Sequence, residues 1–188
     1  MKVLSEVEGA AALALARQAL EAAVRSEKFC LPCLPPVFEE KRGVFVTLTE
    51  GGELRGCIGL PYPVMPLSQA IPEAAVSAAL QDPRFPAVEP EELPRIRVEV
   101  TVLSVPVPIS GPPEGREFCV QVGTHGLIAR GFGRSGLLLP QVATEYCWSC
   151  GEFLDHTCVK AGLPPGSWKS PRVEVLTFEG QIFHEPVC

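Results

Sequence analysis

The sequence predicts an α+β fold, with a mainly antiparallel sheet, flanking helices and two unequal subdomains. Apolar and polar residues alternate in three segments, 44–60, 95–104 and 173–184, which is the pattern of strands. Two further segments carry helix-capping residues followed by apolar residues at helical spacing. Strands and helices do not alternate regularly along the chain, which disfavours the parallel sheet of an α/β protein.

The helices follow from capping residues and apolar spacing. The first opens at the capping box of Ser5 and Glu8 and is expected to run to about Lys28. A second, alanine-rich helix is expected over residues 67–80, where small side chains allow close packing on the sheet. A later helix opens at Ser149, which stands three residues before a glutamate in a second capping box.

The strands follow from alternation and turn residues. Residues 44–60 indicate one hairpin, because the turn Glu50-Gly51-Gly52-Glu53 supplies glycines that take positive φ without a Cβ clash. Residues 95–104 form the clearest strand. In the last strand, 173–184, one face is expected to hold three apolar residues: Leu176, Phe178 and Ile182.

The best strands bracket a glycine-rich middle section, which suggests two subdomains. The large one is expected to comprise about residues 1–110 plus 172–188. The small, inserted one is expected to comprise about residues 111–171. The proline- and glycine-rich segment 111–115 is interpreted as the linker between them. A cleft is expected at their junction.

The segment Leu54-Arg55-Gly56-Cys57-Ile58-Gly59, called the LRGCIG segment below, is the strongest candidate for a site. In a strand, Arg55 and Cys57 would share one face. Arg55 is expected to be partly buried and hydrogen-bonded, because an unpaired guanidinium there would be costly. Gly56 and Gly59 are poor strand residues, so they suggest a β-bulge or a close backbone approach. Arg84, in the downstream sequence DPRFP, is interpreted either as part of a structural loop or as a rim of the same cleft. Asp82 of the same sequence can cap the loop or pair locally with Arg84.

Cys57 is the candidate nucleophile. A neighbouring guanidinium, here Arg55, favours a thiolate by lowering the pKa of the thiol. A cysteine nucleophile also needs a base and an orienting group, and His125 and Glu145 are the candidates. The alternative is that Cys57 is a small, buried residue at a place of close packing, as most free cysteines are.

Two CxxC pairs, Cys30 with Cys33 and Cys147 with Cys150, are the minimal ligand set of a structural Cys₄ zinc site. The pairs lie far apart in the sequence, so no metal is the default expectation and zinc the alternative. No other cofactor is predicted, because the sequence contains no nucleotide-binding loop, haem motif or CxxxCxxC motif of radical SAM enzymes.

Charge and hydropathy argue against nucleic acid and membranes as partners. The net charge is −6 and the basic residues are scattered, whereas nucleic-acid-binding proteins concentrate lysine and arginine. No apolar run is long enough to span a membrane. Two glutamates precede the apolar N-terminal stretch where a signal peptide would be basic, so a cytoplasmic protein is expected.

The LRGCIG segment also resembles the signature of the AMMECR family, named for the Alport syndrome, midface hypoplasia and elliptocytosis chromosomal region. Four further segments resemble blocks of that family in the same order: 82–86, 122–128, 136–143 and 160–164. Prokaryotic members are called AmmeMemoRadiSam system protein A. A glycine is more usual in the family where this chain has Cys147.

The resemblance implies a cleft at the LRGCIG segment and partnership with Memo-type and radical SAM proteins. The chain would then be component A of a modification system, and would bind a protein or a metabolite in a cleft lined by Arg55 and Cys57. The alternative is a self-sufficient cysteine-dependent hydrolase or transferase with Cys57 as its nucleophile.

Overall fold

Antiparallel strands and flanking helices make up the computed structural model, which describes residues 4–186. The α+β class predicted from the sequence is confirmed. The chain divides into two units, one with the described residues up to Leu103 and from Gln181 on, the other Ser104–Gly180. The predicted subdomain boundaries and the cleft stay predictions. No helix among residues 4–186 is both long and apolar enough to cross a bilayer.

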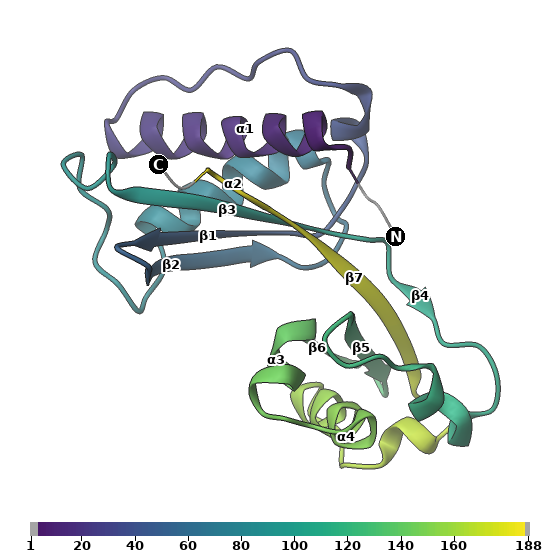
Figure 1. The fold of residues 1–188 in the computed structure, drawn as a ribbon. Coiled ribbons are helices and arrows are strands. Elements are labelled where there is room, and N and C mark those ends of the chain that lie inside the picture. Colours follow the sequence, from purple (N-terminus) through teal and green to yellow (C-terminus); the bar gives the residue numbers. More distant parts are fainter. Residues whose placement is uncertain (1–3, 187–188) are drawn as a thin grey trace. The chain divides into compact units, whose positions relative to one another are not determined.

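In the first unit, two helices lie together on one face of three antiparallel strands (Figure 1). The elements are α1 (Glu6–Val24), the 3₁₀ helix η1 (Pro36–Glu39), β1 (Val44–Glu50), β2 (Glu53–Leu60), α2 (Leu67–Leu80) and β3 (Ile96–Leu103). Strand β1 lies between β2 and β3. The expected hairpin and the strand at 95–104 are therefore confirmed.

Helix α1 begins as predicted and ends earlier. Both hydrogen bonds of the Ser5–Glu8 capping box are present. The expected end at Lys28 is wrong, because α1 stops at Val24. Ser26 has a φ of 56°, and the N–H groups of Ser26 and the next residue donate to carbonyls of the last turn. This is a Schellman motif, in which a serine takes the place usually held by glycine.

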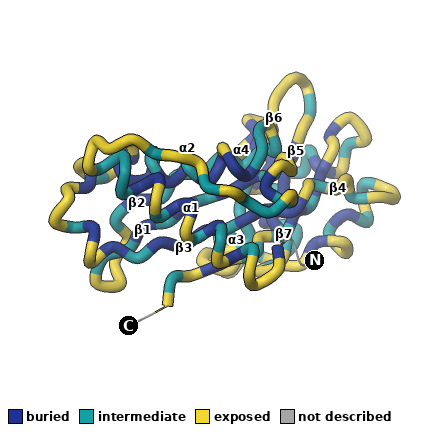
Figure 2. The backbone as a smooth tube through the Cα atoms, turned by 90° about the horizontal axis from the view of Figure 1, so that it is seen from above, coloured by how far each residue is buried: buried dark blue, intermediate teal, exposed yellow. Residues whose placement is uncertain are grey.

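The core of the first unit fills the space between the helices and one face of the sheet. Even-numbered residues of β1 and β3 point into it, so their burial alternates along each strand. Figure 2 shows exposed residues mainly in loops and turns, and buried ones along strands and helices. The largest buried side chains of this core are Leu4, Leu15, Leu20, Phe38, Leu48, Leu67, Ile71 and Ile96.

In the second unit, helices pack against a small antiparallel sheet (Figure 1). Its elements are β4 (Val107–Pro108), η2 (Pro113–Cys119), β5 (His125–Gly131), β6 (Arg134–Leu138), α3 (Pro140–Glu145), α4 (Cys150–Lys160), η3 (Ser167–Lys169) and the first part of β7 (Glu174–His184). The capping box at Ser149 is present. The segment 111–115, interpreted as a linker, runs into the 3₁₀ helix η2, and its role as a linker stays a prediction.

Strand β7 belongs to both units, and its burial pattern changes on the way. In the second unit Leu176 and Phe178 are buried, as expected. Ile182 was expected on the same face, but its side chain is 51% exposed, while the next residue, Phe183, is buried. Phe183 packs closely on α1, since a Cβ at Gly9 would lie 2.1 Å from its ring. A single alternation rule therefore fails for this strand.

Candidate functional site

The guanidinium of Arg55 is occupied inside the first unit. Its Nε donates to Glu92 Oε1 at 2.7 Å and its Nη2 to Glu92 Oε2 at 3.1 Å, a bidentate pair. It also donates to the carbonyls of Pro86 and Ala87 at 2.9 and 3.3 Å. The side chains of Arg55 and Glu92 are only 12% and 18% exposed. Arg55 therefore fastens the loop after α2 to strand β2.

The Glu92 carboxylate is held as an anion by these contacts. The hydrogen bond from Arg55 is the largest cause that lowers the pKa of Glu92, and the Glu89 N–H adds to it at 2.7 Å. The same bond raises the pKa of Arg55. The expectation that Arg55 is partly buried and hydrogen-bonded is confirmed.

A second ion pair, Arg84 with Asp82, covers the outer edge of β2 at Cys57. The N–H of Cys57 donates to Asp82 Oδ2 at 2.9 Å, and its carbonyl accepts from Arg84 Nη2 at 3.2 Å. Arg84 and Asp82 pair with each other at 2.9 and 2.7 Å. Since β2 is an edge strand, these two side chains take the place of a neighbouring strand at this residue. The local pairing of Asp82 with Arg84 is confirmed.

The glycines of the LRGCIG segment stand where no side chain fits. Leu48 pairs with Gly56 and Thr49 with Leu54, so Arg55 is the extra residue of a β-bulge. A Cβ at Gly56 would lie 2.2 Å from the carbonyl oxygen of Ala78 in α2. One at Gly59 would enter the ring of Phe45, likewise at 2.2 Å. The prediction of a bulge and close backbone approach is confirmed.

The buried carboxylate of Asp82 is expected to make the free energy of unfolding decrease at low pH. The hydrogen bond from Arg84, with backbone N–H groups, holds the pKa of Asp82 well below its ordinary value. A group with a depressed folded pKa stabilises above its unfolded pKa, about 4 for aspartate, and that stabilisation is lost as the pH falls below it. We expect the free energy of unfolding to fall more steeply below pH of about 4 in the wild type than in Asp82→Asn.

Urea unfolding over a pH series measures this difference. Asp82→Asn keeps the shape of the side chain and removes its titration, so subtracting the two curves isolates this one carboxylate from Glu92, whose pKa is lowered as well. Parallel curves for the two proteins below pH of about 4 would contradict the role given to Asp82.

Cys57 itself is half-buried on the sheet face away from the helices. The hydroxyl of Thr47, its partner on β1, donates to Cys57 Sγ at 3.4 Å. His125 and Glu145, the residues predicted to assist it, lie in the second unit. Nδ1 of His125 accepts from the Gln121 N–H at 3.1 Å, and Glu145 is exposed at the end of α3. Their role at Cys57 stays a prediction.

The four cysteines of the CxxC pairs have different surroundings. Cys30 and Cys33 are exposed in the first unit, and Cys147 is exposed in the second. Cys150 is half-buried, and its thiol donates to the Val120 carbonyl at 3.4 Å. Within residues 4–186, no group of three or more His, Cys, Asp or Glu side chains has the arrangement of a metal site. The zinc alternative and the expected absence of a metal both stay predictions.

The face of the first unit's sheet that points away from the helices carries a row of polar residues that was not predicted from the sequence. Cys57, Thr47 and Glu99 are successive partners across β2, β1 and β3. On β7, His184 Nδ1 pairs with Glu99 Oε2 at 3.1 Å. His184 therefore continues this row on β7. The only available signal was the alternation of β7, which changes along that strand.

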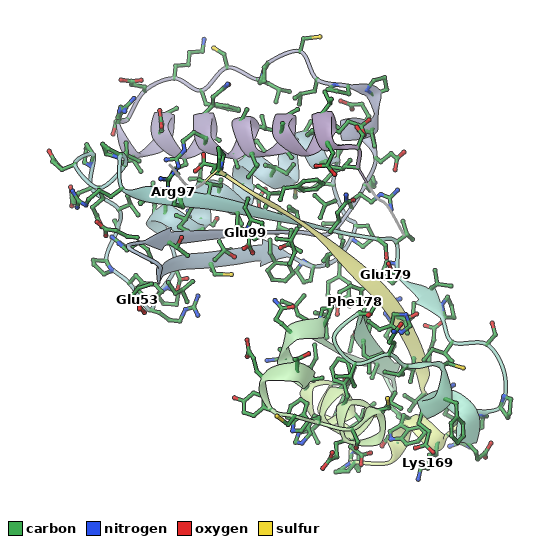
Figure 3. The ribbon with its side chains drawn as sticks, viewed as in Figure 1. Glu53, Arg97, Glu99, Lys169, Phe178 and Glu179 are labelled. Atoms are coloured by element: carbon green, nitrogen blue, oxygen red, sulfur yellow. The ribbon has the colours of Figure 1, made fainter. Side chains whose placement is uncertain are left out.

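A cavity of about 770 Å³ lies at one end of this row. Figure 3 labels two of its residues, Arg97 and Glu99, which come from neighbouring odd positions of β3. Its lining carries both signs of charge and the two glycines of the hairpin turn: Thr49, Glu50, Gly51, Gly52, Arg95, Arg97, Val98, Glu99, His184 and Glu185. Such a lining suits a polar ligand that carries charge of both signs.

Comparisons with known proteins show which proteins this chain is similar to. The AMMECR1 family model matches residues 13–183. The protein Mbar_A1807 of Methanosarcina barkeri is 53% identical over 97% of this chain and 93% of its own length. The protein MJ0810 of Methanocaldococcus jannaschii is 47% identical over 98% and 94%. The crystal structure of the uncharacterized protein PH0010 from Pyrococcus horikoshii matches with a TM-score of 0.84 and 43% identity, over 98% of this chain and 94% of that one.

Proposed function

This chain belongs to the AMMECR1 family, and we propose that it works as the binding component of a modification system rather than as a self-sufficient enzyme. The proposed partners are Memo-type and radical SAM proteins, which carry the chemistry. The chain binds the protein or metabolite on which these partners act. The family relationship supports this proposal, and so do the contacts of the LRGCIG segment.

The observation that carries the proposal is the engagement of Arg55, which uses four of its five N–H donors within the first unit. Its guanidinium makes two hydrogen bonds to Glu92 and two to backbone carbonyls. A guanidinium engaged in this way stabilises the fold and is not available to activate a thiol or hold a transition state. Arg55 of the LRGCIG segment thus stabilises the packing of the loop after α2 on strand β2.

The surroundings of Cys57 favour binding over thiol catalysis. A nucleophilic cysteine needs a base within hydrogen-bonding distance. The hydrogen bond to its sulfur comes from a hydroxyl, that of Thr47. The imidazole on the same sheet face is that of His184, three strands away in the row, which is roughly 14 Å at the usual strand spacing. This separation is too long for direct proton transfer.

The cavity beside His184 supports metabolite binding. Its volume of about 770 Å³ lies within the usual range for small-molecule sites. It brings the carboxylate of Glu99 and the guanidinium of Arg97 together on β3, beside the imidazole of His184. We propose a polar metabolite with charges of both signs as its occupant.

We expect Cys57→Ala to leave complex formation unchanged. The experiment mixes the purified chain with the Memo-type and radical SAM proteins of the same organism and measures the complexes by sedimentation velocity. Wild type and Cys57→Ala should give complexes with Kd values within about twofold, because the loss of one sulfur removes little binding energy. Absence of a complex with either protein would refute the component assignment.

A turnover assay tests the alternative of a cysteine enzyme. The isolated chain is assayed with activated esters and thioesters, and Cys33→Ala provides a control that removes an exposed cysteine elsewhere in the first unit. All three proteins are expected to show the same background rate. Turnover in the wild type and Cys33→Ala that is lost in Cys57→Ala would establish Cys57 as a nucleophile and overturn the proposal.

A further inference from the structure

Three aromatic rings stack at the surface of the second unit, where α3 passes into α4. The ring centroids of Tyr146 and Trp148 are 5.0 Å apart, with 16° between the ring planes. Those of Trp148 and His156 are 3.9 Å apart, with 7° between the planes. Trp148 is therefore the shared member of a stack of three nearly parallel rings, called the aromatic stack below.

The backbone around the aromatic stack is held by several independent contacts. The Trp148 N–H donates to the Ala143 carbonyl at 2.9 Å, and Cys147 turns the chain with a φ of 53°. Ser149 then opens α4 through its capping box with Glu152. His156 lies on α4, so the helix fixes one ring and the preceding turn fixes the other two. The aromatic stack is thus organised before any partner arrives.

Tyr146 is an exposed member of the aromatic stack. Its side chain is 66% exposed, although the ring packs against Trp148. A stacked, exposed ring of this size can serve as an anchor point for a partner, because it offers a rigid apolar area with little loss of side-chain entropy.

Three glutamates lie at the junction of α3 and α4, which carries the aromatic stack. Glu145 is exposed and directly precedes Tyr146, and Glu152 is exposed in the first turn of α4. Glu117 reaches the same helix end, since its Oε2 lies 3.5 Å from where a Cβ at Gly151 would be. The lysine of α4, Lys160, is the last residue of the helix and stands four residues, about one turn, after His156. The three glutamates outnumber this one cation.

We propose that the aromatic stack with Glu117, Glu145 and Glu152 is a docking site for an arginine-bearing, basic segment of a protein partner. A guanidinium stacks flat on an aromatic face and at the same time donates to carboxylates beside it. The net charge of −6 steers a basic segment towards the chain. The site rests on the proposed binding function and gives the chemistry of the partner.

Other occupants fit this surface less well. A nucleobase would stack equally well, but its phosphates would face the three carboxylates and the negative net charge. A methylated lysine is usually held in a cage of rings, whereas these rings are nearly parallel. Lysine offers a point charge without a planar face, so it gains from the carboxylates alone.

The test measures binding of a dye-labelled peptide, acetyl-Gly-Arg-Gly-Arg-Gly-Arg-amide, to the whole chain by fluorescence anisotropy. Tyr146→Ala is expected to weaken binding by about five- to tenfold, because the stacking face is lost. Tyr146→Phe should stay within about twofold of the wild type, since it keeps the ring. Amide chemical shifts of residues 145–152 should move on titration.

Two controls make the result specific to the aromatic stack. Phe132→Ala removes a ring that is 64% exposed elsewhere in the second unit and should leave the affinity unchanged. The corresponding lysine peptide should bind more weakly than the arginine peptide. Equal effects of Phe132→Ala and Tyr146→Ala, or equal affinity for both peptides, would overturn the proposal. Tighter, Tyr146-dependent binding of a thymidine decanucleotide would overturn it in favour of nucleic acid.

The sedimentation experiment separates this inference from the proposed function. Complexes with Memo-type and radical SAM proteins, together with no binding of the arginine peptide, would refute the docking site and leave the component assignment standing. Binding of the peptide through Tyr146, without a complex with either protein, would refute the component assignment and support the docking site.

Discussion

Replacing Arg55 with alanine is expected to lower the free energy of unfolding by about 3 kcal/mol, because it leaves a mostly buried carboxylate without its partner. Glu92 is only 18% exposed and would lose both hydrogen bonds from the guanidinium. The carbonyls of Pro86 and Ala87 would lose a donor as well. Urea unfolding followed by circular dichroism measures the change.

Arg95→Ala is the matched control for this prediction. Arg95 also pairs with a glutamate through its Nε, but its side chain is 60% exposed, against 12% for Arg55. Exposed ion pairs contribute little, so we expect a loss of less than about 1 kcal/mol. Similar losses for Arg55→Ala and Arg95→Ala would show that Arg55 does not fasten the loop to β2.

Gly56→Ala is expected to lower the free energy of unfolding by a similar amount, about 3 kcal/mol. The new Cβ would meet the Ala78 carbonyl oxygen at 2.2 Å, so strand β2 and helix α2 would have to separate. Gly59→Ala should cost less, because it meets the ring of Phe45, and a side chain can turn away where a helix backbone cannot. Urea unfolding of both variants gives the comparison.

Gly115→Ala is the control for glycine replacement itself. The nearest atom to its Cβ would be Pro112 Cγ at 3.9 Å, an ordinary van der Waals distance. We expect a change within about 1 kcal/mol. A loss for Gly56→Ala no larger than that for Gly115→Ala would mean that α2 and β2 are not held as close as the structure has them.

Local signals made much of the fold predictable. Both capping boxes involve residues three apart, and the turn at Gly51 and Gly52 is marked by its composition, with φ of 60° and 90°. The pairing of Asp82 with Arg84 was predictable for the same reason. The family assignment from the LRGCIG segment is confirmed by a match over residues 13–183.

The candidate site was less predictable, because its contacts are distant in the sequence. Arg55 pairs with Glu92, which lies 37 residues later in the sequence. The alternation of a strand predicts which face a side chain is on, but it does not predict which residue that side chain contacts. The prediction therefore assigned the guanidinium of Arg55 to its near neighbour Cys57. The pairing of His184 with Glu99 was missed because it depends on the register between β7 and β3, which no local pattern contains.

The shared strand β7 has a consequence for synthesis on the ribosome. Arg17 of α1 is paired with Glu185, 168 residues later, and Leu4 is hydrogen-bonded to Gln181. At usual rates of translation, the residues of β7 and Glu185 that contact the N-terminal segment are therefore synthesised on the order of 10–30 s after helix α1. During that time the surface that Phe183 will cover stays open to chaperones and to other chains. We expect nascent chains arrested before residue 180 to bind holdases, and release to follow once β7 has left the exit tunnel.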